Sequence, residues 1–438
     1  MINKILLKIN KIIPQKWQWV LEHEGFVKYF KNTGWMFAGQ VFSLFVSFFV
    51  GVWVIRYLGP ENYGVLSYAL AFVTLFSFVA SLGIDNILKR ELINIPEKRD
   101  ALMGTAFWLR LVGGLMALIL VIVIIFLTDN SSLLRLLVIM YSFIFIFQPF
   151  HIITNLFQSK VEAEKDSKAK VIGITISAIL KIVLMLSGLG VIWIMLVYLL
   201  DSLWLALALI YYYRRSNLYL KDWNFDYSLA KKMLSDSWLL ALTSVSVMIY
   251  MKIDQVMIKE MLSNASVGLY SAAVRVFELS YIVPSIICAS FFPAIINAKK
   301  VNIGSYYNRL RNLSFLLLFF SIVSALVISI FSGLIVKLLF GPEYLGSIIA
   351  LKIGVWSVVG IAIGAVVGQY LIAENYVKIY FYITLFGAII NIGLNYLMIP
   401  VYGIAGAAIA SVFSYLIVPI SLVFFRKTRR DVVGVFRG

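Results

Sequence analysis

Long apolar runs alternate with short polar segments along the whole chain. A helix needs about 20 apolar residues to cross the hydrocarbon layer of a membrane. Each run is too long for a strand of a membrane barrel, so the pattern predicts twelve membrane-spanning helices. They are expected at 33–56, 65–88, 101–127, 133–157, 168–188, 191–213, 234–261, 266–292, 312–338, 347–372, 378–399 and 403–425.

The composition agrees with an all-α integral membrane protein. Hydrophobic residues make up 62% of the 438 residues and charged residues only 13%, whereas a soluble domain is nearer half apolar and a quarter charged. Cys288 is the only cysteine, and His23 and His151 are the only histidines. No disulfide framework and no metal site built from cysteine or histidine is therefore expected.

The basic residues lie mostly in the connections and set the topology. Of the 38 lysines and arginines, 29 fall on one side of the twelve-helix scheme, and only Arg56, Arg135, Lys259 and Lys337 fall on the other. The positive-inside rule then places both termini in the cytoplasm. We interpret the net charge of +17 in this way rather than as nucleic-acid binding.

Residues 1–32 are expected to form a basic cytoplasmic tail without the features of a signal peptide. Residues 2–13 (INKILLKINKII) place isoleucine and leucine on one helical face and lysines on the other. This segment either lies as a helix on an anionic membrane surface or serves as an irregular basic tail that helps orientation.

Two pairs of stretches in the chain resemble each other. IRYLGPENYGVLSYA (55–69) matches KEMLSNASVGLYSAA (259–273) at an offset of 204, and LMLSGLGV (184–191) matches LMIPVYGI (397–404) at an offset of 213. The alternative is that small residues recur at tight turns. We predict two parallel six-helix halves, 33–213 and 233–425, with a cytoplasmic linker at 214–232 and a basic tail at 426–438. Halves of this kind leave a central cleft, which favours an alternating-access transporter.

Charged residues within the spans are the candidate functional residues, because an ionisable side chain in hydrocarbon costs several kcal/mol unless it faces protein or water. A surplus of cations in a wet cleft would attract an anion such as a pyrophosphate or an acidic sugar. The alternative is structural pairing, of Arg275 with Glu278 and of Lys181 with Asp201. The candidate substrate-binding residues are Arg275, Lys252, Arg110 and Lys181, and the candidate counter-charges or ion-coupling residues are Asp254, Glu278 and Asp201.

No catalytic motif is present. The chain has no Walker loop, C-x-x-C, H-E-x-x-H or G-x-S-x-G pattern, and its outward connections are short. We therefore expect neither an enzyme nor a bound cofactor.

Several segments resemble polysaccharide repeat-unit flippases of the O-antigen type, in the multidrug, oligosaccharidyl-lipid and polysaccharide exporter superfamily. They are residues 32–92, which contain RYLGPENYG, together with KIDQVMIKEMLSNASVGLYSAAVRV (252–276), LLFGPEYLGS (338–347) and IPVYGIAGAAIAS (399–411). The likeness covers nearly the whole chain apart from its tails.

This resemblance implies a protein of the prokaryotic cytoplasmic membrane that flips an oligosaccharide repeat unit on a polyprenyl pyrophosphate to the outer leaflet. It implies that Lys252, Asp254 and Arg275 match cavity-lining positions. Coupling to Na⁺ or H⁺ stays open, and membrane lipid and a polysaccharide polymerase or glycosyltransferase are the implied partners. The alternatives are a cation-coupled multidrug exporter of the same superfamily, a membrane glycosyltransferase or polymerase, and a passive scaffold.

Overall fold

The computed structural model describes residues 24–129 and 131–429, and every regular element in these residues is a helix. The segment 2–13, expected to lie on the membrane, and residues 430–438 of the tail are outside the described residues. The described residues group into two compact units. The first unit holds the described residues up to Gly51, Val79–Thr128 and Ile139–Ser237, and the second holds Val52–Phe78, Asp129–Val138 and the residues from Trp238 onward.

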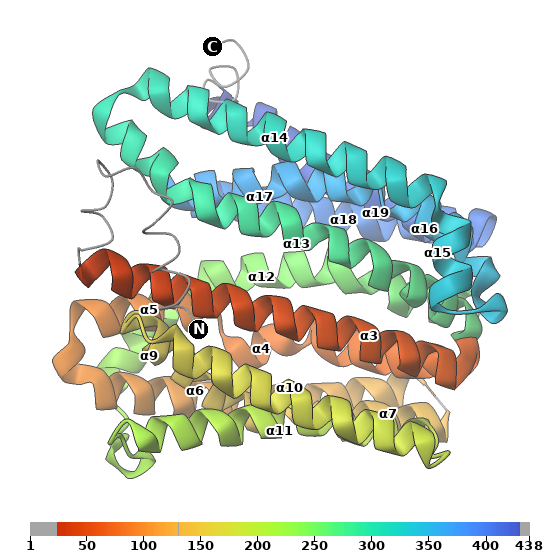
Figure 1. The fold of residues 1–438 in the computed structure, drawn as a ribbon, viewed down its shortest axis with the longest axis horizontal. Coiled ribbons are helices and arrows are strands. Elements are labelled where there is room, and N and C mark those ends of the chain that lie inside the picture. Colours follow the sequence, from red (N-terminus) through yellow and green to blue (C-terminus); the bar gives the residue numbers. More distant parts are fainter. Residues whose placement is uncertain (1–23, 130, 430–438) are drawn as a thin grey trace, which may run out of the picture. The chain divides into compact units, whose positions relative to one another are not determined.

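The first unit is a helical bundle in which α10 and α11 lie side by side (Figure 1). A broken helix, made of short helical segments between residues 144 and 159, packs against both α6 and α11. The elements of this unit are α3 (Glu24–Leu75) up to Gly51, α5 (Asp85–Asn94), η2 (Pro96–Lys98), α6 (Arg99–Thr128), the end of α7 (Ser132–Ser142), α8 (Ile144–Phe147), η3 (Gln148–His151), α9 (Ile152–Ser159), α10 (Ala163–Leu186), α11 (Val191–Arg215) and η4 (Leu220–Asp222).

The second unit contains the longest helices of the carboxyl-terminal part of the chain. A buried apolar core that includes Phe292, Leu313, Val366 and Ile383 holds α13, α14, α17 and α18 together. The elements here are α3 from Val52 onward, most of α7, most of α12 (Tyr227–Met261), α13 (Asn264–Val301), α14 (Ile303–Ile330), α15 (Ser332–Leu339), η5 (Pro342–Ser347), α16 (Ile348–Gly354), α17 (Ser357–Ala373), α18 (Val377–Tyr402), α19 (Ile404–Ile420) and η6 (Ser421–Phe424).

Large apolar side chains cover the outward faces of these helices. Leu127, Leu186 and Ile330 are 80%, 84% and 72% exposed. A soluble monomer rarely exposes wide contiguous apolar patches. The chain is therefore a multi-pass membrane protein whose outer faces lie against lipid.

Ten helices among the described residues are long and apolar enough to cross a membrane. An eleventh results if Pro342–Gly354 and Ser357–Ala373, which meet at 45°, form one bent span. The expected number of twelve is not confirmed by this count, and the difference lies in residues 33–88. The sequence predicts two spans there, whereas the structure has one long helix, α3 (Glu24–Leu75), followed by α4 (Ser77–Ser81) and α5.

A kink at Gly59 accounts for this difference. Its φ of 66° and ψ of 171° are not helical, and this conformation is essentially restricted to glycine. Pro60 then begins the next helical arm, a position that proline favours. The apolar part of α3 covers 44 residues, about 66 Å of straight helix, which is twice the hydrocarbon thickness of about 30 Å. Gly59 thus divides α3 at the turn that the sequence places between the first two spans.

The connection between α11 and α12 is anchored to the first unit. The Trp223 ring nitrogen donates to the Tyr213 hydroxyl at 2.8 Å, and the Asp226 amide donates to Thr105 at 3.0 Å. Lys232 pairs with Glu91 of α5 at 2.8 Å. The hydrogen bond from Lys232 lowers the pKa of the Glu91 carboxyl.

The two stretches that resemble each other in sequence lie against each other in the second unit. A Cβ atom on Gly64 would lie 1.8 Å from the carbonyl oxygen of Asn264, and a Cβ atom on Gly268 would lie 1.9 Å from that of Pro60. Each glycine therefore faces the carbonyl group four residues before the other glycine. The contact is reciprocal under the same offset of 204 that relates the two sequences.

We expect Gly64→Ala and Gly268→Ala to destabilise the protein, because each new methyl group would overlap a backbone carbonyl. Overpacking of this kind costs about 1–3 kcal/mol. The measurement is the midpoint of thermal unfolding of the purified protein in detergent. Gly393→Ala in α18 is the matched control, because nothing lies within 4 Å of its added Cβ. Unchanged midpoints for both variants would contradict the close backbone contact.

Candidate functional site

A small polar cavity in the second unit brings together three of the candidate residues. Lys252 reaches it from α12, and Arg275 and Glu278 reach it from α13. Its volume is 130 Å³, well below the roughly 300–1,000 Å³ of usual ligand pockets. It has room for a phosphate-sized group or a few water molecules, but not for an oligosaccharide. The other lining residues are Tyr63, Ser67, Leu70, Ala71, Thr74, Gln255, Ser271 and Val274.

Glu278 pairs with Lys252 across two helices. The distance from Lys252 Nζ to Glu278 Oε1 is 3.0 Å. The spacing of three residues in the sequence offers a different pair as the alternative, between Arg275 and Glu278 within one helix. In the structure the carboxylate contacts Lys252, and Arg275 lines the same cavity.

Asp254 points away from Lys252, as two positions separated by two residues on one helix must. It is only 3% exposed. The Tyr270 hydroxyl donates to its carboxylate at 2.7 Å, the Asn395 amide donates at 2.6 Å, and the Ser411 hydroxyl also donates. No lysine or arginine of the described residues forms an ion pair with it.

The surroundings of Asp254 are rich in oxygen atoms. Asn391 Oδ1 accepts a hydrogen bond from Asn395 at 3.1 Å, and the buried Asn395 Oδ1 has no partner among the described residues. A buried carboxylate without a cationic side chain is costly unless it binds a proton or a metal cation. Hard cations prefer oxygen ligands of this kind.

The partners of Asp254 were not anticipated from the sequence. Asn391 and Asn395 are four residues apart inside an apolar span, a spacing that places both on one helical face. This spacing is the feature of the sequence that indicates a buried polar face on this helix. Tyr270 and Ser411 carried no comparable signal, because isolated hydroxyl groups are common in membrane helices.

In the first unit, Arg110 of α6 forms an ion pair with Asp85 at the start of α5. The Asn155 amide donates to the other oxygen of Asp85 at 2.6 Å. The sequence shows no acidic residue within the span that holds Arg110. Its partner lies 25 residues earlier and becomes visible only in the folded bundle.

Lys181 of α10 pairs with Asp201 of α11 at 2.9 Å. The Lys181 ammonium group also lies 3.7 Å from the centre of the Tyr198 ring, which adds a cation–π interaction. This is the structural pairing weighed from the sequence. Lys181, Arg110 and Lys252 each have a carboxylate partner, so the surplus of positive charge is smaller than the sequence suggests.

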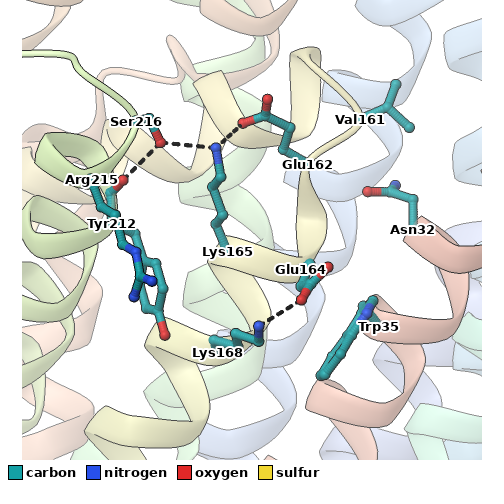
Figure 2. Close-up of a pocket in the computed structure, with 10 residues that line it drawn as sticks. All are labelled: Asn32, Trp35, Val161, Glu162, Glu164, Lys165, Lys168, Tyr212, Arg215 and Ser216. Carbon is teal, nitrogen blue, oxygen red and sulfur yellow. Dashed lines mark hydrogen bonds and ion pairs between the residues drawn. The ribbon is translucent and has the colours of Figure 1, made fainter. Parts of the chain in front are cut away.

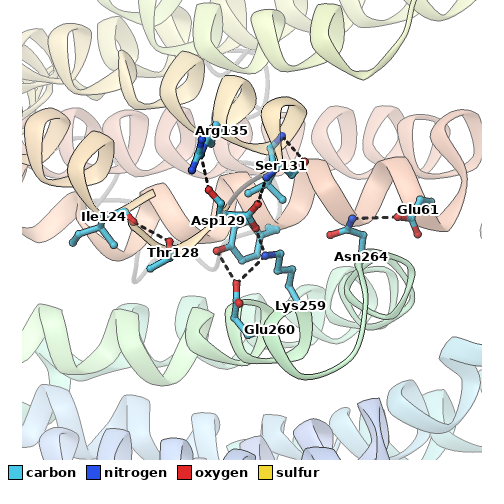
Figure 3. Close-up of polar contacts among 11 residues, drawn as sticks. Glu61, Ile124, Thr128, Asp129, Ser131, Arg135, Lys259, Glu260 and Asn264 are labelled. Carbon is cyan, nitrogen blue, oxygen red and sulfur yellow. Dashed lines mark hydrogen bonds and ion pairs between the residues drawn. The ribbon is translucent and has the colours of Figure 1, made fainter. Parts of the chain in front are cut away.

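A cluster of charged residues in the second unit joins α12 and α13 to residues 52–78 and 129–138 (Figure 3). Lys259 pairs with Asp129 and with Glu260, the latter at 3.0 Å. The Asn264 amide donates to Glu61 at 3.2 Å. These contacts, with the reciprocal glycine contact, explain why the two earlier segments belong to the second unit.

Another cavity, of 560 Å³, lies in the first unit between α3, α10 and α11 (Figure 2). Lys165 bridges Glu162 at 2.7 Å and Ser216 at 2.8 Å. Lys168 pairs with Glu164 at 2.6 Å and lies 5.2 Å from the Trp35 ring centre. Tryptophan and basic residues in this arrangement are typical of the membrane–water interface.

Comparison with known proteins identifies the family. Residues 29–299, more than half of the chain, match the family model described as polysaccharide biosynthesis protein. The chain belongs to this family. It is 23% identical over 412 residues to the capsular polysaccharide biosynthesis protein CapF of Staphylococcus aureus, which covers 91% of this chain and 99% of that protein.

Solved structures show the same fold at low sequence identity. A multidrug resistance MATE family transporter of the MOP superfamily, in an inward-facing conformation, matches with a TM-score of 0.71 and 16% identity, over 90% of this chain and 96% of that one. The lipid II flippase MurJ, in an inward closed conformation, matches with a TM-score of 0.68 and 16% identity, over 93% and 92%. The fold of this family member is therefore that of MATE and MurJ transporters.

We expect Lys181→Met to lower the midpoint of thermal unfolding, because Asp201 loses its cation. Removing one partner of a fully buried pair costs about 3–5 kcal/mol, and a smaller loss is expected here because the Asp201 side chain is 36% exposed. The double variant Lys181→Met with Asp201→Asn should recover much of the loss. A double variant as unstable as the single one would show that the pair is not structural.

Proposed function

We propose that the protein moves a polyprenyl-pyrophosphate-linked oligosaccharide repeat unit from the cytoplasmic to the outer leaflet, for synthesis of a surface polysaccharide. The membership of a multi-pass chain in the polysaccharide biosynthesis family carries this proposal. The name of the CapF relative, which refers to a capsular polysaccharide, and the description of MurJ as a lipid II flippase support it.

The polar cavity of the second unit supplies the chemistry that such a substrate requires. Arg275 offers a planar fork of donors and Lys252 a compact charge, and both suit the oxygen atoms of a pyrophosphate. Glu278 already occupies Lys252, so an incoming phosphate would replace one anion by another. The cavity is too small for the sugars, so the helices around it must separate when the head group enters.

The transport cycle follows from the need to keep a polar head group out of hydrocarbon. The cavity opens toward the cytoplasm, the cations bind the pyrophosphate, and the lipid tail stays in the bilayer. The helices then rearrange, and the head group leaves on the other side. No bond is made or broken, so the protein acts as a transporter and not as an enzyme.

The same proposal includes a cellular location and functional partners. The protein resides in a prokaryotic cytoplasmic membrane, and the uneven distribution of lysine and arginine supports cytoplasmic termini. A polysaccharide polymerase and glycosyltransferases are the proposed functional partners.

A multidrug exporter of the same fold is the second candidate. The MATE match favours it on fold alone, whereas the family match favours polysaccharide synthesis. Leaflet-resolved assays in liposomes separate the two, with a defined lipid-linked oligosaccharide in one arm and a cationic drug in the other.

We expect Arg275→Ala and Lys252→Ala to abolish glycan export while the protein still inserts into the membrane, because the pyrophosphate loses its cations. The measurement is the appearance of the lipid-linked oligosaccharide in the outer leaflet, with membrane insertion followed in parallel. Lys352→Ala is the matched control, since Lys352 is an exposed cation and does not line the 130 Å³ cavity. Normal export by both cavity variants would exclude the proposed role of these cations.

We also propose that Asp254 binds the coupling cation, Na⁺ or H⁺. Its burial, its oxygen-rich surroundings and its lack of a basic partner among the described residues support this role. Glu278 and Asp201 are weaker candidates, because each is already paired with a lysine.

Asp254→Asn should make transport independent of the Na⁺ or proton gradient, because the amide keeps the shape of the side chain but has no charge. The initial rate of flipping in liposomes is measured with and without each gradient. Glu164→Gln, which removes an exposed carboxylate of α10, is the control and should keep the response of the unaltered protein. A variant at Asp254 that still responds fully to the gradient would rule the residue out.

A further inference from the structure

A cavity of 400 Å³ lies in the first unit, among α5, the broken helix at 144–159 and the membrane-spanning helices α6, α10 and α11. Nine of its ten lining residues have polar side chains, and the only apolar one is Leu205. Arg110 lies within an apolar span, where a charged side chain is costly unless it contacts water, a ligand or a counter-charge. The proposed transport site of the second unit does not use this cavity.

Among the described residues, three cationic side chains and one carboxylate line the cavity. Arg110 comes from α6, Lys89 from α5 and Lys170 from α10, while Asp85 is the acidic residue. Asp166, which is buried beside the cavity, pairs with Lys170 at 2.9 Å. Lys89 forms no ion pair with any described residue. The cavity therefore keeps a positive charge after all pairs are counted.

Arg110 retains hydrogen-bonding capacity. It is only 7% exposed, and it pairs with Asp85 through one terminal nitrogen. Its Nε–H has no partner among the described residues. Asp85 is shared with a second donor, because its other carboxylate oxygen accepts from Asn155. A buried guanidinium with an unused donor is a costly arrangement that a second anion would relieve.

The geometry points to a site for a phosphate-type oxyanion in this cavity, held by Arg110 and Lys89. An arginine fork and a lysine together match the oxygen atoms of a phosphate or pyrophosphate. A metal cation is disfavoured, because the only lining carboxylate is already occupied by Arg110 and Asn155. A neutral sugar would leave the charge of Lys89 unmatched. The amide of Gln148, which also lines the cavity, can donate to a further oxygen.

The test is binding of inorganic pyrophosphate to the full-length protein, purified in an uncharged detergent and titrated by calorimetry at constant ionic strength. A background with Lys252→Gln and Arg275→Gln removes the cations of the 130 Å³ cavity. In this background we expect saturable binding that weakens at least tenfold when Lys89→Gln is added. Lys168→Gln is the matched control, because Lys168 is a cation of the same unit that pairs with Glu164 outside the cavity.

A second variant distinguishes a loss of binding from a loss of folding. Asp85→Asn combined with Arg110→Gln removes both members of the ion pair, so no unpaired charge is left, and it should weaken binding by a similar factor. Lys89→Gln should leave the thermal midpoint of the ligand-free protein unchanged, which a purely structural role would not predict. Absence of saturable binding, or binding that neither variant weakens, would overturn the proposal.

Binding measurements in nanodiscs of two lipid compositions distinguish between two sources of the phosphate group. If a lipid headgroup occupies the site, pyrophosphate should bind more weakly in phosphatidylglycerol nanodiscs than in phosphatidylcholine nanodiscs. Lys89→Gln should then remove this difference. Equal affinity in both lipids assigns the site to a soluble or substrate-borne phosphate. The site does not depend on the proposed transport: a loss of export by Arg275→Ala tests that function, whereas pyrophosphate binding tests this cavity.

Discussion

The cost of a charge in hydrocarbon governs the interior of this protein. Arg110, Lys181 and Lys252 lie in apolar spans, and each contacts a carboxylate on a neighbouring helix. An isolated charge there would be unfavourable by several kcal/mol, so these pairs constrain which helices can lie beside one another. Asp254 differs from these residues, since among the described residues its hydrogen-bond donors are neutral and no cationic side chain forms an ion pair with it.

Much of the fold could be predicted from the sequence, because the length of an apolar run reflects the thickness of a bilayer. The helical class and most of the spans follow from that pattern. The first two spans are separated without a loop, because the non-helical backbone of Gly59 alone divides the two arms of α3. The sequence resemblance between 55–69 and 259–273 corresponds to a contact in the structure, since the backbones at Gly64 and Gly268 lie against each other.

The candidate sites were only partly predictable. The sequence indicates which residues are charged and at what depth, and this singled out Lys252, Arg275 and Glu278, which share one cavity. Partners that are distant in sequence depend on how helices pack. Asp85 therefore remained hidden as the partner of Arg110, and Asn395 as a donor to Asp254.

The ion pair between Lys252 and Glu278 has a consequence for any anion that visits this cavity. Such an anion competes with the Glu278 carboxylate for Lys252. Its binding free energy is only the difference between two similar electrostatic attractions. The anion is therefore not bound too tightly, and Glu278 can pair with Lys252 again when the anion dissociates. A carrier needs this balance, because a cargo held too firmly would stop the cycle at its midpoint.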